Sequence, residues 1–164
     1  MQASHSVRRI ITPAMFVAAT VVIARFFIIP VPMTHGNINL CDTGIFMAAL
    51  LFGRRDGLIV GGLSGFILDL ISGYSQYMFF SLIVHGLEGF IIGWLGYRVS
   101  RKMQFLALLV GVVVMVGGYF ISDTILYSLT PGLLGIPMNS IQGLVGAIIA
   151  WPLSIRLNKY ITNR

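Results

Sequence analysis

Charge is scarce in this chain: only 10% of its 164 residues are Asp, Glu, Lys or Arg, whereas an ordinary soluble domain has about 25%. Hydrophobic residues make up 57%, and the mean hydropathy is +0.90. These values indicate an integral membrane protein. About 20 apolar residues cross a bilayer as a helix. We therefore expect five or six crossings, a single membrane domain over residues 1–164, and no appended soluble domain.

Residues and motifs with redox, metal or ATPase chemistry are equally scarce. Cys41 is the only cysteine, which excludes an intrachain disulfide and disfavours zinc sites built from several cysteines. The sequence lacks the G-x-x-x-x-G-K-[ST] loop that cradles ATP phosphates. It also lacks the H-E-x-x-H zinc motif, because His85-Gly86-Leu87-Glu88 has no second histidine. We expect no metal and no cofactor in this chain, and no enzymatic activity.

The apolar residues predict an all-α membrane protein with six helices. Their approximate ranges are 10–29, 42–52, 57–72, 76–97, 104–129 and 138–157. Pro30 and Pro32 end the first helix, because proline lacks an amide hydrogen and fixes φ. The segment TPGLLGIP, residues 130–137, contains two prolines and two glycines. It is expected to form a break between the last two helices.

The basic residues indicate how these helices are oriented. Cytoplasmic connections of membrane proteins are rich in Lys and Arg. With the amino terminus in the cytoplasm, ten of the eleven basic residues lie on that side, and the outer connections near 30–42, 72–77 and 130–138 contain none. Both termini are therefore predicted to be cytoplasmic. The basic residues that give the net charge of +6 lie in small groups at helix ends and not along one face. This placement argues against nucleic acid as a partner.

Polar side chains gather in the outer half of the predicted bundle. At about 1.5 Å per residue, His85 and Glu88 lie roughly 14 and 18 Å from the outer start of their helix. Four more polar residues lie near outer helix ends: Asp69, Asp123, Asn139 and Gln142. Such groups are costly in lipid and usually line space enclosed by protein. Together they predict a substrate pocket that opens outward.

Simpler interpretations of the same residues stay open. Asp69 and Asp123 could be hydrated helix-end residues, and the two amides could be ordinary helix-start groups. His85 and Glu88 are spaced i to i+3, so they could satisfy each other in a structural pair. Arg25, near the outer end of the first helix, either reaches the lipid headgroups or faces the pocket.

Small and aromatic residues follow patterns of their own. Glycines recur every fourth residue at 57, 61 and 65, which favours close helix packing in lipid. Ala14 and Ala18 form a similar pair that could face a partner. Aromatic residues near the outer side could stack on a flat ligand ring; they are Tyr74, Tyr77, Phe79, Phe80, Tyr119 and Tyr127.

One enzyme hypothesis deserves a test. Gly62-Leu63-Ser64-Gly65 matches the G-x-S-G motif of rhomboid proteases, which are also six-helix proteins, and His85 could serve as the base. The glycine that follows the histidine, Gly89, is one position later than in that family. Two alternatives to a transporter subunit are therefore an intramembrane serine hydrolase and a stand-alone small carrier or channel.

The phrase DTGIFMAALLFGRRDGLIVGGLSGFILDLISG, followed by HGLEGFIIGWLGY, resembles the S components of energy-coupling factor (ECF) transporters, which import B vitamins and related solutes in prokaryotes. The short second helix and the long first outer loop fit this resemblance. It implies a substrate-binding subunit in the prokaryotic cytoplasmic membrane. A transmembrane T component and two cytoplasmic ATPases would be its partners, and ATP would be used only by those partners.

The resemblance also assigns roles to residues. Ala14 and Ala18 match an A-x-x-x-A pattern that contacts the T component, and the first outer loop, Pro30 to Leu40, would act as the gate. That gate contains Pro30, His35, Asn37 and Asn39. Ligand contacts in the family come from this loop and from the fourth to sixth helices. This supports His85, Glu88, Asp123, Asn139 and Gln142, with Asp69 and Arg25 as further candidates.

The charges of the predicted pocket narrow the ligand. Three acidic residues face only Arg25 and two histidines, which favours a neutral or weakly basic polar ring over a carboxylate. Thiamine binders of this family rely on outer tryptophans, which this chain lacks. Hydroxymethylpyrimidine or pyridoxine is therefore the first choice. Pantothenate, which requires Arg25 in the pocket, is the second.

Overall fold

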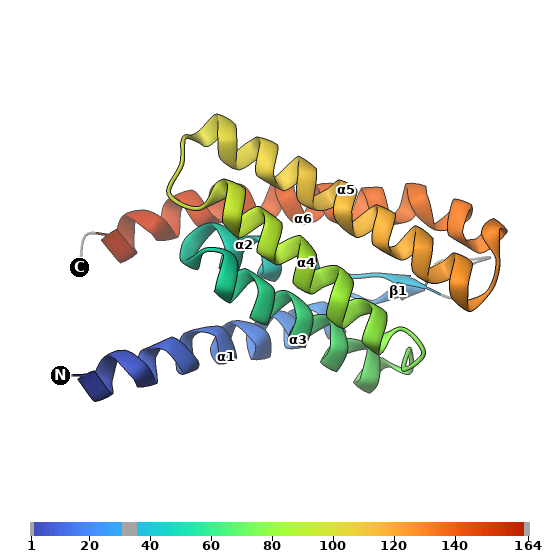
Figure 1. The fold of residues 1–164 in the computed structure, drawn as a ribbon, viewed down its shortest axis with the longest axis horizontal. Helices are drawn as coiled ribbons and strands as arrows, with labels where there is room; N and C mark the ends of the chain where they lie inside the picture. Colours follow the sequence, from blue (N-terminus) through green and yellow to red (C-terminus); the bar gives the residue numbers. More distant parts are fainter. Residues whose placement is uncertain (1, 31–35, 163–164) are drawn as a thin grey trace.

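The computed structural model describes residues 2–30 and 36–162. Within these ranges the chain forms six helices and one short β hairpin (Figure 1). In chain order the elements are α1 (Gln2–Phe26), β1 (Ile29–Pro30), β2 (Asn37–Ile38), α2 (Cys41–Phe52), α3 (Arg54–Ser72), α4 (Met78–Gly96), α5 (Arg101–Leu126) and α6 (Leu129–Thr162). The predicted all-helical architecture is confirmed.

The helices form an elongated bundle. α5 and α6 pack against each other on one side, α1 lies on the other side, and α2, α3 and α4 lie between them (Figure 1). The amino-terminal end of α1, the start of α5 and the carboxyl-terminal end of α6 lie at one end of the bundle, and the hairpin lies toward the other (Figure 1). We call these the basic end and the pocket end.

The short helix α2 lies at the centre of the core. Ile45, Phe46 and Ala49 are fully buried, and they belong to one apolar cluster with Ile92 of α4 and Leu108 of α5. A helix that is hydrophobic on all faces is stable only when other elements surround it. At 1.5 Å per residue, its twelve residues span about 18 Å. α2 is therefore too short to cross a hydrocarbon core of about 30 Å by itself.

Among the described residues, length and composition identify four helical segments that can cross a membrane. They are Arg9–Phe26, Met78–Gly96, Arg101–Leu126 and Leu129–Tyr160. Large apolar side chains such as Phe26, Val113 and Ile148 are more than two-thirds exposed, as expected where lipid replaces water around the bundle. The chain is a multi-pass membrane protein.

The glycine spacing of α3 produces its close contact with α4. A Cβ atom on Gly57 would overlap the carbonyl oxygen of Gly89, and one on Gly61 would overlap that of His85. Small residues let two helix backbones approach closely in lipid. The predicted packing role of these glycines is confirmed, and the close approach holds His85 at a fixed depth.

The first outer connection contains a structure that the sequence pattern did not indicate. Ile29 pairs with Ile38 and Pro30 with Asn37 in an antiparallel two-stranded sheet. The paired segments are only two residues long, too short for an alternating hydrophobic pattern to be visible. His35, which we predicted in the gating loop, lies outside the described residues.

The expected break over residues 130–137 is wrong, because α6 begins at Leu129. Pro131 lies in the first turn, where amide hydrogens have no partner within the helix, so proline is tolerated there. Pro137 lies inside the helix, as membrane helices permit when nearby groups satisfy the freed backbone. Gly135 and Asn139 are therefore part of α6 itself, near its start. Other boundaries differ less: α1 begins at Gln2, α3 at Arg54 and α5 at Arg101.

Candidate ligand-binding site

A polar cavity of about 40 Å³ lies at the pocket end, between the hairpin and the ends of α3, α4, α5 and α6. One water molecule needs roughly 10–15 Å³ on this measure, so the cavity has room for about three water molecules. The residues that line it are Gly36, Asn37, Asn39, Asp69, Tyr77, Tyr119, Asp123, Gly135, Met138, Asn139 and Gln142. Six of our predicted site residues are among them, together with two of the predicted aromatic residues.

Two carboxylates lie on opposite helices of this cavity. Asp123 of α5 is 6% exposed, and its Oδ1 accepts a hydrogen bond of 2.5 Å from the Tyr77 hydroxyl. Asp69, near the end of α3, is 8% exposed, and its Oδ2 has no hydrogen-bond partner within the described part of the chain. A buried acceptor without a donor is unfavourable. Asp69 therefore offers a place for a ligand donor.

The connection between β2 and α2 is tied to α6 by amide side chains. The backbone nitrogen of Asn39 donates to Gln142 Oε1 at 2.8 Å, and Asn39 Oδ1 accepts from the backbone nitrogen of Cys41 at 2.8 Å. Asn39 Nδ2 also donates to Asn37 Oδ1 at 2.9 Å. These bonds fix the start of α2 against α6. They place the amides of the loop at the wall of the cavity.

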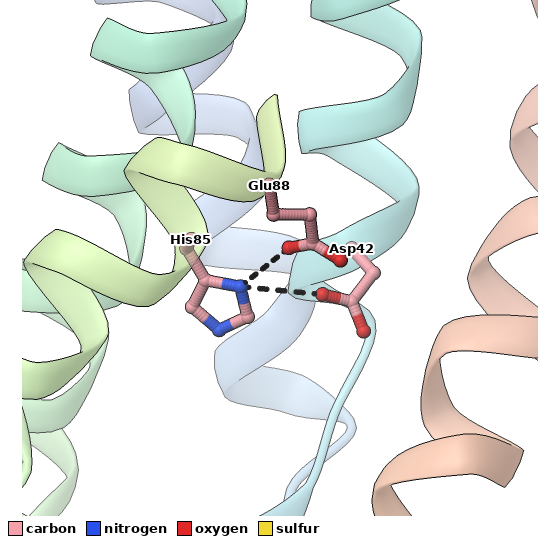
Figure 2. Close-up of side chains that lie close together, drawn as sticks. All are labelled: Asp42, His85 and Glu88. Carbon is pink, nitrogen blue, oxygen red and sulfur yellow. Dashed lines mark hydrogen bonds and ion pairs between the residues drawn. The ribbon is translucent and has the colours of Figure 1, made fainter. Parts of the chain in front are cut away.

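His85 and Glu88 do not line the cavity, but lie in the protein interior behind Tyr119. His85 is 3% exposed and Glu88 is fully buried. Figure 2 shows one ring nitrogen of His85 facing both carboxylates. This nitrogen, Nδ1, lies 2.8 Å from Glu88 Oε2 and 3.4 Å from Asp42 Oδ1. Its other nitrogen, Nε2, lies 3.0 Å from the Tyr119 hydroxyl. Tyr119 is thus the link between the pocket and this buried group.

The two carboxylates determine the tautomer of the imidazole. With both carboxyl groups ionised, Nδ1 faces two acceptors and carries the hydrogen, so in the neutral ring Nε2 accepts from Tyr119. Tyr119 then accepts from Ser81, whose Oγ is 2.6 Å away. The series of hydrogen bonds from Glu88 through His85 and Tyr119 to Ser81 fixes the direction of each hydroxyl. A ligand at Tyr119 therefore meets a defined acceptor and not a freely rotating group.

Asp42 is the residue of this network that sequence reasoning missed. It is fully buried in the first turn of α2, with no hydrogen-bond partner for Oδ1 or Oδ2 by distance and angle among the described residues. An acidic residue in a helix's first turn is usual, so its position gave no warning. The available signal was its isolation: the ten residues that follow it, Thr43 to Phe52, contain no charge.

Asp42, His85 and Glu88 each present one possible ligand atom, and these atoms lie within 4.8 Å of one another. A divalent cation accepts this mixture of imidazole and carboxylate ligands. The hydrogen bond between His85 and Glu88 engages the same nitrogen that a cation would need. The donor set is therefore present, while the observed geometry is that of a hydrogen-bonded network.

The remaining predicted residues lie elsewhere. Arg25 is exposed near the end of α1, and Pro30 is exposed in β1; neither is among the residues that line the cavity. Ala14 and Ala18 are both exposed on α1, with the four-residue spacing that places them on one face. Both therefore lie on an accessible face of the helix.

The serine and histidine of the hydrolase hypothesis do not form a catalytic pair. Ser64 is fully buried, and its Oγ has no hydrogen-bond partner in the described residues. Both nitrogens of His85 are engaged, by Glu88 and by Tyr119. Nucleophile and base require a mutual hydrogen bond, and this geometry does not provide one.

The fold and the cavity define a class: a small multi-pass membrane protein with a buried polar pocket at one end of its bundle, as expected for solute binding. The chain belongs to the S components of ECF-type transporters, because the family model described as "ECF-type riboflavin transporter, S component" matches residues 4–159. This is a family of transport proteins. The resemblance inferred from the sequence is confirmed.

Three comparisons give the family context. The chain is 40% identical to the thiamine precursor transporter HmpT of Lactococcus lactis subsp. cremoris over 152 residues, which are 92% of this chain and 88% of that protein. It is 32% identical over 134 residues to an uncharacterized protein of Pyrococcus woesei, covering 81% and 90% of the two chains. The crystal structure of FolT bound with folic acid has the same fold, with a TM-score of 0.64 at 18% identity, covering 96% and 92%.

Proposed function

We propose that this chain is the substrate-binding subunit of an ECF importer and that its substrate is a small, neutral or weakly basic ring of the thiamine-precursor type. Hydroxymethylpyrimidine is the first choice, and pyridoxine is a second ring of similar size and polarity. The pocket binds this ring, and partner subunits provide the energy for transport.

The charge of the pocket is the observation that carries this proposal. Among the described residues that line it, two are acidic, four are amides and none is basic. A ligand carboxylate would meet like charge there without an Arg or Lys to pair with. Amino and hydroxyl groups would instead find acceptors, above all Asp69 Oδ2, which has no hydrogen-bond partner in the part of the chain that the structure describes.

Two aromatic side chains support a ring-shaped ligand. The rings of Tyr77 and Tyr119 have centroids 6.4 Å apart at an angle of 56°, and both line the cavity. Aromatic side chains favour offset or tilted contacts with other rings. The hydroxyl of Tyr77 is held by Asp123 and that of Tyr119 by Ser81 and His85. The position of each ring is therefore constrained before a ligand arrives.

The relatives agree with this ligand class to different degrees. The 40% identical relative is named a thiamine precursor transporter, and hydroxymethylpyrimidine is such a precursor. The family model carries the word riboflavin, which is also a flat polar molecule but a larger one. Pantothenate has less support than the sequence suggested, because Arg25 does not line the cavity.

The coupling to ATP is also part of the proposal. The T component would contact the exposed Ala14 and Ala18 of α1, and two ATPases in the cytoplasm would bind and hydrolyse ATP. Both termini would lie in the cytoplasm of a prokaryotic cell. The basic residues support this orientation, since Arg54, Arg101 and Lys159 all lie at the end of the bundle opposite the pocket.

The test is to identify the small molecule that copurifies with the protein by mass spectrometry after expression in a host that makes B vitamins. Recovery of hydroxymethylpyrimidine or pyridoxine supports the proposal. Recovery of pantothenate or folate contradicts the ligand class. Efficient uptake by this chain alone, in vesicles that contain no ATPase, would contradict the subunit role and favour a stand-alone carrier.

A further inference from the structure

A second cavity, of about 230 Å³, lies at the basic end of the bundle, far from the ligand pocket. It is formed where α2 ends, α5 begins and α6 ends. Its polar lining consists of Arg101, Gln104, Ser154, Asn158 and Lys159. None of these residues takes part in the ligand pocket or in the network around His85.

The charge of this cavity is positive and has no acidic counterpart in its lining. From residue 124 to the end of the chain, and from 89 to 122, the sequence has no Asp or Glu. The acidic residue of the basic end, Asp56, lies on α3 and interacts with Arg9 and Arg55. The positive dipole end of α5 begins at Arg101 and adds to the potential. An anion would be attracted to this site.

A buried hydroxyl marks the inner wall of the cavity. Ser154 is 4% exposed, and its Oγ has no hydrogen-bond partner among the described residues. It lines the cavity together with the two cations. A buried hydroxyl without a partner is unfavourable, and an anionic oxygen in the cavity would accept its hydrogen. This observation is independent of the surface charge.

An apolar groove begins where the polar cavity ends. Arg101 lines both of them, and the groove of about 520 Å³ continues along Lys102, Phe105, Leu106 and Trp151. Its walls are the side chains of α5 and α6, with the rings of Phe105 and Trp151 5.8 Å apart. Trp151 Nε1 is buried there without an acceptor in the described residues. The site thus has a charged part and a long apolar part joined at one arginine.

We propose that this composite site binds an anionic phospholipid. Its phosphate lies between Arg101 and Lys159 and accepts from Ser154, and one acyl chain follows the groove past Phe105 and Trp151. Basic pockets between helices near a membrane surface are suited to acidic headgroups. A free phosphate ion would use the cations but leave the groove empty. The two parts together therefore select a lipid.

Native mass spectrometry of the detergent-purified protein tests this assignment. The probes are phosphatidylglycerol, phosphatidylcholine and inorganic phosphate, added separately and in competition. The double variant Arg101→Gln/Lys159→Gln removes both cations. Arg55→Gln/Arg156→Gln removes the same charge from exposed residues that do not line the cavity. Ser154→Ala removes the buried hydroxyl with little change in volume.

Phosphatidylglycerol is expected to remain bound to the wild-type protein and to the control variant, and to bind at least about tenfold more weakly to Arg101→Gln/Lys159→Gln. Ser154→Ala is expected to weaken binding about threefold. A large excess of inorganic phosphate should not displace the lipid. None of these measurements requires the vitamin-type ligand, so they stand apart from the proposed transport function.

Four outcomes would overturn the assignment. Equal retention of phosphatidylcholine would show that binding does not depend on the charge of the headgroup. Displacement by inorganic phosphate would identify a simple anion site. Equal lipid binding by the double variant and its control would show that the two cations of the cavity do not bind the lipid. A loss of partner-subunit assembly in the double variant alone would identify the surface as a protein interface. Thermal melting of each variant in detergent verifies that it is folded.

Discussion

The two ends of the bundle carry opposite charges and hold them differently. In the pocket and in the buried network behind it, four of the five acidic residues are at most 8% exposed; they are Asp42, Asp69, Glu88 and Asp123. At the basic end, residues such as Arg55, Arg101 and Arg156 are exposed. A buried charge depends on particular partners, whereas an exposed one is solvated and screened. Ligand binding should therefore be sensitive to small changes at one end and insensitive at the other.

The largest effect is expected from the two carboxylates of the pocket. Asp69→Asn and Asp123→Asn keep the side-chain size but remove the charge that a ligand donor meets. Hydrogen bonds to charged groups contribute roughly 1.5–3 kcal/mol, so each variant should bind about tenfold to a hundredfold more weakly. Calorimetric titration with hydroxymethylpyrimidine and with pyridoxine measures this. Unchanged affinity in both variants would show that the two pocket carboxylates do not contribute to ligand recognition.

The second effect tests the buried network behind the pocket. Glu88→Ala leaves the imidazole of His85 without its acceptor at 2.8 Å, so Tyr119 loses its fixed orientation. We expect binding more than about tenfold weaker, a loss of about 1.4 kcal/mol or more, because the ligand would no longer meet Tyr119 in a fixed orientation. Asp42→Asn should show the same trend. Assembly of the Glu88→Ala variant with partner subunits, measured by copurification, should persist. Equal ligand affinity of wild type and Glu88→Ala would show that the network is purely structural.

A smaller effect is expected from Tyr119→Phe. This change removes one hydroxyl that bridges Ser81 and His85 and keeps the ring that lines the pocket. A neutral hydrogen bond contributes about 0.5–1.5 kcal/mol, so affinity should fall about twofold to tenfold. Ser81→Ala serves as the matched control on the same hydroxyl. If Tyr119→Phe weakens binding more than Glu88→Ala does, Tyr119 acts on the ligand independently of the network.

The smallest effect is expected at the basic end. Arg55→Gln/Arg156→Gln removes two exposed charges, and ligand affinity should stay within about twofold, because screened charges this far from the pocket have little influence. The comparison is made by the same titration at low and at high salt. A marked loss of affinity at low salt would show that the two ends are electrostatically coupled.

Much of the fold could be predicted from the sequence, because apolar length and basic clusters are strong signals. The glycines at 57 and 61 gave the close packing of α3 on α4 for the same reason: few other residues permit it. The start of α6 could not be found from Pro131 and Pro137. Proline punctuates a sequence strongly, but it is harmless in a first turn and tolerated within membrane helices.

The candidate site could be predicted in outline and not in depth. Position along a helix correctly placed Asp69, Asp123, Asn139 and Gln142 at the pocket end. It could not show that Tyr119 separates His85 from the cavity, since which side chain lies in front depends on helix rotation and packing. Asp42 was missed because its role depends on contacts with α4, which is far from it in the chain. The hairpin was missed because its paired segments are only two residues long.

The central claim is that an acidic pocket selects a neutral or weakly basic ring. The most direct test is isothermal titration of the purified wild-type protein with hydroxymethylpyrimidine, pyridoxine and pantothenate under identical conditions. The account predicts that one of the two rings binds at least about a hundredfold more tightly than pantothenate, a difference of roughly 2.7 kcal/mol. Tighter binding of pantothenate than of either ring would contradict it.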